Sequence, residues 1–248
     1  MLKRKITRYL EQHLVSASNK ILLVEGARQV GKSYVIREVG QRLFANYVEL
    51  NFVTDNEGVQ LFKNVHTVDE FYLRLSSVAG DRLGNYNDTL IFLDEIQCYP
   101  QYLTLLKFLR EEQKYRFIAS GSALGMALRH TTSIPVGSVI IKKMYPLDFE
   151  EFLWANKYGE NAISDLYNHF LNQQSLSEEQ HEQLLELFRR YLLVGGLPDV
   201  VNEYLATHNI LNVRNLQNAI AAMYEADASQ YENNASRRLL IRRIYAMI

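Results

Sequence analysis

Short apolar runs alternate with segments of helical length through the first 146 residues of the chain. Five of these runs have strand length, and apolar residues at helical spacing fill most of the sequence between them. Such alternation is typical of a parallel α/β sheet. The predicted strands are residues 20–25, 47–52, 89–93, 115–119 and 138–144.

Helices are expected to flank this sheet. Residues 1–18 are predicted to form a helix that packs before the first strand. Residues 57–82 are predicted to form a helical insertion in which Tyr72 and Leu73 are buried. Residues 1–146 are therefore interpreted as one α/β core.

Pro146 marks a change in the pattern. From residue 148 to residue 208, leucines and phenylalanines recur at helical spacing and no strand is evident. We interpret residues 147–210 as a helical lid, and the alternative is a helical subdomain that merely extends the core. Residues 211–248 are helical again and are expected to begin a further domain.

Residues 26–33 spell the pattern G-x-x-x-x-G-K-[ST] of a phosphate-binding loop. Glycines let the backbone fold tightly around a polyphosphate, the lysine reaches the β- and γ-phosphates, and the hydroxyl binds Mg²⁺. The loop follows an apolar strand and precedes a helix, as the motif requires. The alternative is a glycine-rich turn that merely enters a helix. The predicted nucleotide-binding residues are Gly26, Ala27, Arg28, Gln29, Val30, Gly31, Lys32, Ser33 and Tyr34.

A second motif, Asp94-Glu95, ends the apolar run of residues 89–93. An uninterrupted apolar run is typical of a central parallel strand, and ligand sites lie at the carboxyl ends of such strands. Because neighbours on a strand point to opposite sides, Asp94 is expected to hold the Mg²⁺ shell while Glu95 orients a water. The alternative is a pair of solvated carboxylates.

Polar residues also follow two other predicted strands. Ser120 and Ser122 are candidates for sensing the γ-phosphate, and a serine that caps the next helix is the alternative. Asn51 and Asp55 are interpreted as solvated loop residues rather than as nucleotide contacts.

Five segments in a fixed order make the chain resemble a family of AAA+-like P-loop ATPases from bacteria and archaea. They are GARQVGKS, LIFLDEIQ, FIASGSA, MYPLDFEEFL and VGGLPDVV, and the resemblance runs from about Leu2 to the end of the chain. Walker motifs alone are shared by many families. The combination of DEIQ with Pro146-Leu147 and GGLP is more specific.

The resemblance implies a role for individual residues. Glu95 would be the catalytic carboxylate, Lys32 would assist it at the phosphates, and Ser120 would take a sensor-like position in catalysis. Gln97 would contact the nucleotide or relay its state. The residues implied to bind the triphosphate and Mg²⁺ are Gly26, Gly31, Lys32, Ser33 and Asp94, of which Ser33 and Asp94 belong to the metal site.

The chain departs from the family at one position. Many relatives carry Gly-Arg before the strand that leads to the Pro-Leu segment, where this chain has Gly137-Ser138. An arginine that acts on a neighbouring subunit's phosphate is then lacking, or Arg129, Lys142 or Lys143 replaces it. Relatives also continue into a winged-helix-like region and a nuclease-like α/β domain. The sequence is therefore expected to be truncated within a winged-helix-like region.

Composition excludes several classes of protein. Lys and Arg number 27 against 28 Asp and Glu, a balance that gives no nucleic-acid footprint over the whole chain. Cys98 is the only cysteine, so intrachain disulfides and cysteine metal clusters are excluded and a cytoplasmic location is expected. No apolar run reaches the length of a membrane span. One local basic stripe could contact DNA or form a solvated face, and it consists of Arg237, Arg238, Arg242 and Arg243.

Three functions are compatible with these motifs. The first is an ATPase that binds ATP and Mg²⁺ and couples hydrolysis to conformational change; the chain has no Asn-Lys-x-Asp guanine motif, which favours ATP. The second is a slowly hydrolysing nucleotide-gated switch that regulates a protein partner or DNA, in a monomer or an oligomer. The third is a small-molecule kinase, which the Asp94-Glu95 pair disfavours.

Overall fold

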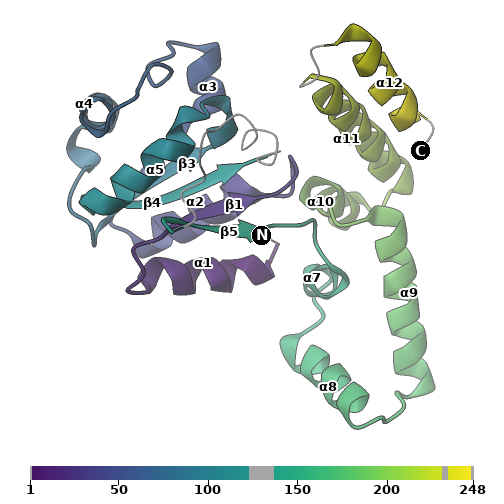
Figure 1. Cartoon of the computed structure of the whole chain (residues 1–248). Helices are drawn as coiled ribbons and strands as arrows, with labels where there is room; N and C mark the ends of the chain where they lie inside the picture. The colour runs from purple at the N-terminus through teal and green to yellow at the C-terminus, as the bar shows by residue number, and fades with distance from the viewer. Residues whose placement is uncertain (1, 123–136, 231–233, 247–248) are drawn as a thin grey trace. The chain divides into compact units, whose positions relative to one another are not determined.

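The chain forms two compact units, Met1–Leu147 and Asp148–Ile248. They are seen in a computed structural model that describes residues 2–122, 137–230 and 234–246 (Figure 1). The first unit carries the sheet, and the described residues of the second form helices joined by short connections. The further division that we predicted at residue 210 stays a prediction.

A five-stranded parallel sheet forms the centre of the first unit, with the strand order β2-β3-β4-β1-β5. The predicted α/β class is confirmed, and each observed strand overlaps a predicted one. β4 lies between β1 and β3, so the segments that follow β1 and β3 meet across the end of β4. The strands are β1 (Ile21–Glu25), β2 (Asn46–Asn51), β3 (Thr89–Asp94), β4 (Arg116–Gly121) and β5 (Val139–Lys143).

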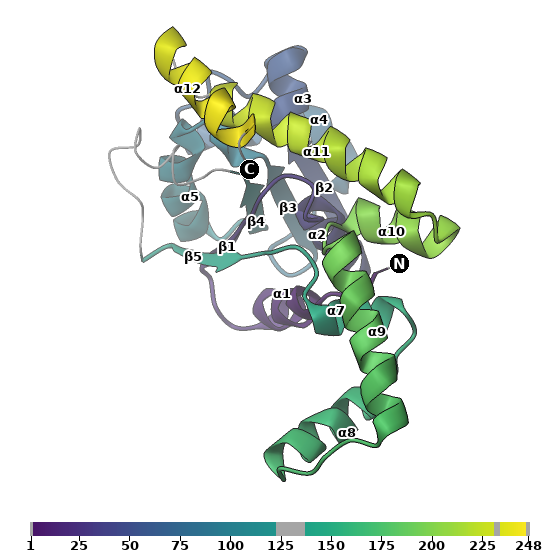
Figure 2. The same cartoon turned by 90° about the vertical axis from the view of Figure 1, so that its right-hand side faces the viewer.

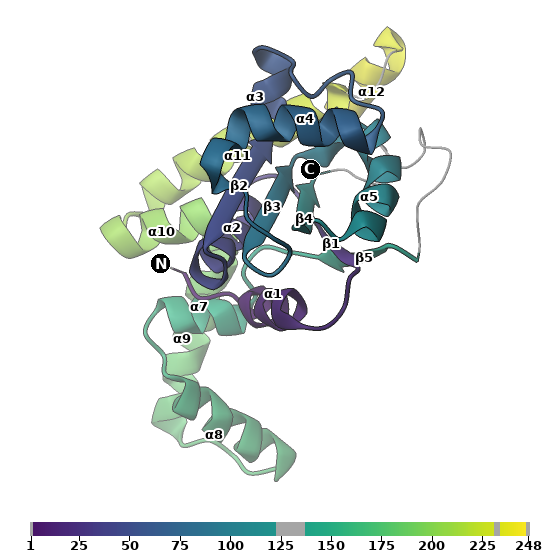
Figure 3. The ribbon, with the colours of Figure 1, turned by 90° about the vertical axis from the view of Figure 1, so that its left-hand side faces the viewer.

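Helices cover both faces of this sheet (Figures 1 and 3). β3 is buried along its whole length, as its uninterrupted apolar sequence requires. Ile91 and Leu93 of β3 belong to the same buried cluster as side chains of α4 and α5, whereas α1 and α2 pack against each other. The helical segments of this unit are α1 (Lys5–Val15), α2 (Lys32–Leu43), α3 (Phe52–Glu57), α4 (Val68–Ala79), η1 (Gly80–Arg82), η2 (Ile96–Cys98) and α5 (Gln101–Glu112).

The predicted helical insertion at residues 57–82 is shorter than expected. Its main helix, α4, begins only at Val68, where Thr67 and Glu70 form a capping box. Tyr72 is buried, as predicted, but Leu73 is 75% exposed and its predicted burial is wrong. Phe71, Tyr72 and Leu75 occupy the inner face of α4, and Leu73 lies on the opposite face. The apolar character of Leu73 was therefore not enough to predict which face of α4 it occupies.

An aromatic cluster fills the space between α4, α5 and the sheet. Phe71 is fully buried at its centre. Its ring centroid lies 6.1 Å from that of Phe62, 6.0 Å from that of Tyr102 and 6.0 Å from that of Phe117. These contacts join the insertion to β4, so that α4 stabilises the sheet.

The second unit contains six described helices and no strand among its described residues (Figures 1 and 2). Asp148 caps α7, Ser177 caps α9, and Gly195 ends α9 with φ at 75°, ahead of Pro198 in the first turn of α10. No helix in the described part of the chain is both long and apolar enough to cross a bilayer. The helices are α7 (Phe149–Ala155), α8 (Glu160–Leu171), α9 (Glu178–Val194), α10 (Pro198–Thr207), α11 (Ile210–Gln230) and α12 (Ala235–Ala246).

Replacement of Phe71 by alanine is expected to lower the free energy of unfolding by about 3–5 kcal/mol, because it removes a fully buried ring and leaves a cavity. Leu73→Ala, on the exposed face of the same helix, is the matched control and should change it by no more than ~0.5 kcal/mol. Urea-induced unfolding followed by circular dichroism measures both. Equal effects of the two substitutions would contradict the assignment of the helix faces.

Candidate functional site

The loop of residues 26–33 joins the carboxyl end of β1 to the amino end of α2. Gly31 precedes the helix with φ at 93°, and Gln29 also has a positive φ of 62°. A Cβ atom at Gly26 would lie 2.3 Å from the backbone oxygen of Met144. Position 26 therefore requires glycine because of this close approach, and position 31 favours it because of its left-handed backbone. The loop directs the amino end of α2 toward the space above the strand ends, as anion-binding loops do.

Lys32 is buried, with only 4% of its surface exposed. Its ammonium donates hydrogen bonds to the backbone oxygens of Gly26 at 3.0 Å and Ala27 at 2.8 Å, so it lies over the loop. Burial lowers the pKa of Lys32, and the negative charges of Glu95 and Asp94 oppose that shift. A polyphosphate on the loop would add negative charge beside this ammonium and would stabilise its protonated form.

Asp94 ends β3 and is 2% exposed. Its carboxylate accepts hydrogen bonds from the Ser33 hydroxyl at 2.8 and 3.0 Å and from Asn51 Nδ2 at 3.1 Å. It also accepts one from the Ser120 hydroxyl. Burial raises the pKa of Asp94, and the hydrogen bonds from Ser120 and Ser33 oppose this shift. One buried carboxylate thus joins the first turn of α2 to the ends of β2 and β4.

Glu95 follows directly in the left-handed conformation, with φ at 54°. Its Oε2 atom accepts hydrogen bonds from the Ser122 hydroxyl at 3.0 Å, the Ser122 amide at 3.3 Å and Gln97 Nε2. Gln97 Nε2 donates a further bond to the Ser122 hydroxyl at 3.1 Å. We expected strand alternation to separate the two carboxylates, but the separation comes from this left-handed turn after the strand has ended.

Two polar residues have roles that the sequence analysis missed. Asn51 contacts Asp94 and caps α3, and Asp55 accepts hydrogen bonds from the Tyr99 hydroxyl at 2.7 Å and the Leu61 amide at 2.8 Å. Their interpretation as solvated loop residues is wrong, because both bind within the protein. The sequence signal for Asn51 was only its place near the end of a predicted strand, and the β2–β3 register that sets it opposite Asp94 came from the structure.

The other candidate residues lie at or outside this site. Tyr34 is 53% exposed on the first turn of α2. Arg129, one possible replacement for the family arginine, lies outside the described residues. Lys142, another replacement, places its ammonium 4.4 Å from the ring centroid of Tyr9. Lys143, the third, is exposed at the end of β5.

The oxygens of Ser33 and Asp94 suit Mg²⁺, which takes few protein ligands, better than a metal ion that is coordinated by protein side chains alone. The described residues contain no group of three or more His, Cys, Asp or Glu side chains placed to hold a metal ion. Mg²⁺ is commonly bound by one or two protein oxygens together with substrate phosphates and water. Ser33 and Asp94, whose oxygens lie 2.8 Å apart beside the loop, provide such a pair.

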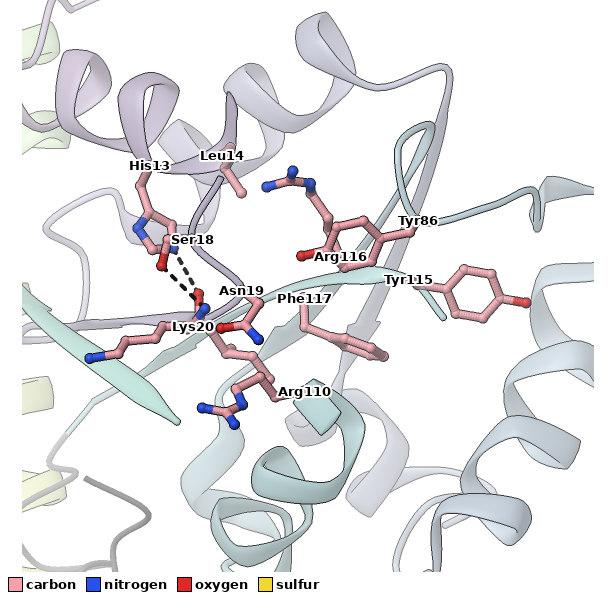
Figure 4. A pocket seen from close by; sticks show the side chains of 11 residues that line it. His13, Leu14, Ser18, Asn19, Lys20, Tyr86, Arg110, Tyr115, Arg116 and Phe117 are labelled. Carbon is pink, nitrogen blue, oxygen red and sulfur yellow. Dashed lines mark hydrogen bonds between the residues drawn. The ribbon is translucent and has the colours of Figure 1, made fainter. Parts of the chain in front are cut away.

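A separate pocket lies at the amino ends of β1 and β4, where Ile21 and Phe117 line it (Figure 4). Lys20, Arg110 and Arg116 are also among its lining residues. The cavity measures about 20 Å³, enough for about one water and too little for a nucleotide. This pocket is therefore not a candidate nucleotide site.

Comparison with protein families gives two matches. The sequence profile described as AAA domain matches residues 18–153, which is more than half of the chain. A profile for a domain of unknown function matches residues 185–248. No curated protein matches the sequence.

Two solved structures are similar to the chain at low sequence identity. The Walker-type ATPase PABY2304 of Pyrococcus abyssi has a TM-score of 0.56 at 12% identity, over 96% of this chain and 77% of its own. The AMPPCP-bound DnaA of Aquifex aeolicus has a TM-score of 0.47 at 13% identity, over 99% of this chain and 78% of its own. The first of these similarities shows a shared fold.

Gly26→Ala is expected to lower the free energy of unfolding by about 1–3 kcal/mol, since the new methyl group would overlap the Met144 oxygen. Gly137→Ala is the control in the same unit, because a Cβ there meets no atom within 4 Å. Urea unfolding of both variants measures the difference. Equal stability of Gly26→Ala and the wild type would show that the close approach is not a constraint.

Proposed function

The chain belongs to the family of AAA domains, and on that basis we propose that it binds ATP with Mg²⁺ and hydrolyses it, coupling hydrolysis to conformational change. The observation that carries the proposal is the buried Asp94 carboxylate, which holds the Ser33 hydroxyl beneath the loop. The proposal is supported by the position of Lys32, the Ser33–Asp94 pair and Glu95 around one loop.

Phosphate binding is assigned to the loop and to Lys32. The backbone amides at the amino end of α2 would donate to the phosphate oxygens. Lys32 would exchange its bonds to the Gly26 and Ala27 oxygens for bonds to the phosphates. Because the ammonium is buried, its attraction to a phosphate is screened less than it would be in water.

Metal binding is assigned to Ser33 and Asp94. Bound Mg²⁺ would neutralise the charge that develops on the transferred phosphoryl group. Asn51 and Ser120 act through Asp94, because their hydrogen bonds fix the orientation of its carboxylate. Ser120 would also lie close enough to this carboxylate to respond to a change in its ligands.

Glu95 is the proposed group that orients the attacking water. In this step the water oxygen bonds to the γ-phosphorus, the bond to the leaving β-phosphate oxygen breaks, and the proton passes toward Glu95. ADP and inorganic phosphate are the products. Ser122 and Gln97 both donate to Glu95 Oε2, so the carboxylate must keep or rearrange these bonds when it accepts the water.

A slowly hydrolysing nucleotide-gated switch is the second candidate, and the same contacts favour it. Three donors already bind Glu95 Oε2, so this oxygen must exchange at least one of these hydrogen bonds before it can orient a water, and that exchange would slow hydrolysis. A DNA or protein partner and an oligomeric state stay predictions. For DNA, the relevant feature is the basic stripe of α12, where Arg237, Arg238 and Arg243 are exposed.

Lys32→Ala is expected to reduce ATP hydrolysis by about 100-fold or more and to weaken ATP binding, since it removes the buried cation at the phosphates. Glu95→Gln is expected to reduce kcat by a similar factor while retaining ATP, because it removes the water-orienting carboxylate alone. Phosphate release and equilibrium dialysis measure the two properties. Lys107→Ala and Glu57→Gln change exposed residues and serve as controls.

The wild-type rate separates the two candidate functions. Tight ATP binding with turnover at about 10⁻² s⁻¹ or slower would favour the switch. A wild-type chain that binds no nucleotide at all would overturn both functions.

Asp94→Asn is expected to raise the Mg²⁺ concentration needed for half-maximal hydrolysis by roughly 10- to 100-fold, because it removes the negative charge at the proposed metal site. A Mg²⁺ titration of the hydrolysis rate measures this change, and EDTA should abolish hydrolysis by the wild type. Asp69→Asn, on the surface of α4, is the control. An unchanged Mg²⁺ requirement would remove Asp94 from the metal site.

A further inference from the structure

Arg4 is a buried arginine outside both the loop of residues 26–33 and the Asp94-Glu95 motif. It precedes α1, and only 6% of its surface is exposed. Its NH1 group donates to the backbone oxygen of Val30 at 2.8 Å, and its NH2 group donates to the backbone oxygen of Tyr145 at 2.6 Å. One side chain therefore connects the phosphate-binding loop to the segment that follows β5.

One acceptor belongs to the phosphate-binding loop, and the other belongs to the segment that leads to the end of the first unit. Val30 is fully buried between Gln29 and Gly31, the two loop residues with positive φ. Tyr145 lies two residues before Leu147, where the first unit ends. A rotation of the peptide that carries the Val30 oxygen would remove one of the bonds from Arg4.

The same two segments are joined a second time without Arg4. The Met144 amide donates to the Glu25 oxygen at 2.7 Å, and the Met144 oxygen closes the space beside Gly26. The segment of residues 144–147 thus contacts the start of the loop through Met144 and its middle through Arg4. A displacement of the loop would therefore alter the contacts of this segment at two points.

The guanidinium group is suited to this position. A buried cation needs hydrogen-bond partners to offset the loss of its hydration. A planar guanidinium can donate to two carbonyl oxygens at once in a fixed geometry. A lysine ammonium keeps the charge but lacks that fork. The identity of the residue, and not its charge alone, therefore decides whether both carbonyl oxygens are held.

We propose that Arg4 is a positioning residue that holds the phosphate-binding loop in its ligand-ready conformation and couples the loop to residues 144–147, which lead into the helical unit. This inference rests on the proposed binding of ATP. It gives the segment before α1, which lies outside the loop motif, a role in the response to nucleotide.

The test compares Arg4→Lys and Arg4→Met with the wild type and with Arg8→Met, which removes an exposed arginine of α1. ATP affinity is measured by calorimetry at a temperature at which each variant is folded. Amide hydrogen exchange of residues 144–147 is measured with and without a non-hydrolysable ATP analogue. Thermal unfolding without nucleotide measures any purely structural effect.

Arg4→Lys is expected to weaken ATP binding roughly tenfold and to abolish the nucleotide-dependent change in exchange at residues 144–147, while Arg8→Met behaves as the wild type. Should Arg4→Met fail to fold, Arg4→Lys decides the question. A folded Arg4→Lys variant with wild-type affinity and exchange would overturn this inference alone. A wild-type chain that does not bind ATP would overturn the proposed function and this inference with it.

Discussion

The buried carboxylate of Asp94 is the interaction on which the arrangement of the site depends. It receives hydrogen bonds from the first turn of α2, from the end of β2 and from β4, through Ser33, Asn51 and Ser120. An ionised group taken out of water is costly unless such donors replace its hydration. The three donors fix the orientation of the carboxylate, and the shared carboxylate keeps the three donors close to one another. Loss of the carboxylate would remove the acceptor that these three donors share, of which Ser120 is buried and Ser33 and Asn51 are partly buried.

Sheet topology makes this convergence possible. All five strands run parallel, so their polar carboxyl ends lie along one edge. Because β4 is inserted between β1 and β3, the loop after β1 and the carboxylates at the end of β3 lie on either side of Ser120 and Ser122 at the end of β4. The left-handed turn at Glu95 then directs the second carboxylate to Ser122, away from Asp94. Two adjacent acidic residues thereby obtain different surroundings and can perform different tasks.

The nucleotide loop is also held from outside its own motif. Gly26 is confined by the Met144 oxygen, and Val30 is bound by Arg4. Arg4 also donates to the Tyr145 oxygen, so that one side chain joins the residues before α1 to those after β5. The loop is therefore part of a packed structure whose geometry depends on both ends of the first unit. Under the proposed role of Arg4, a change in the loop on nucleotide binding would reach residues 144–147 through these contacts.

Local patterns in the sequence predicted much of the fold. The strands were found because a buried parallel strand needs a continuous apolar run, and the loop was found because its glycines and lysine are required at fixed spacing. The helix face on which a single residue lies was harder to predict. Leu73 was expected to be buried and is exposed, because distant residues decide which side of α4 packs on the sheet. Asn51 and Asp55 were misjudged for the same reason.

The sequence by itself thus determined the fold class, the strands and the residues of the loop, all of which follow from short-range spacing. Only the tertiary structure decided which polar side chains meet. It brought Asn51 to Asp94, Ser122 and Gln97 to Glu95, and Arg4 to Val30. The physical reason is that a hydrogen bond between distant residues leaves no periodic signal in the chain. It arises from strand order and register, which are set by packing of the whole unit.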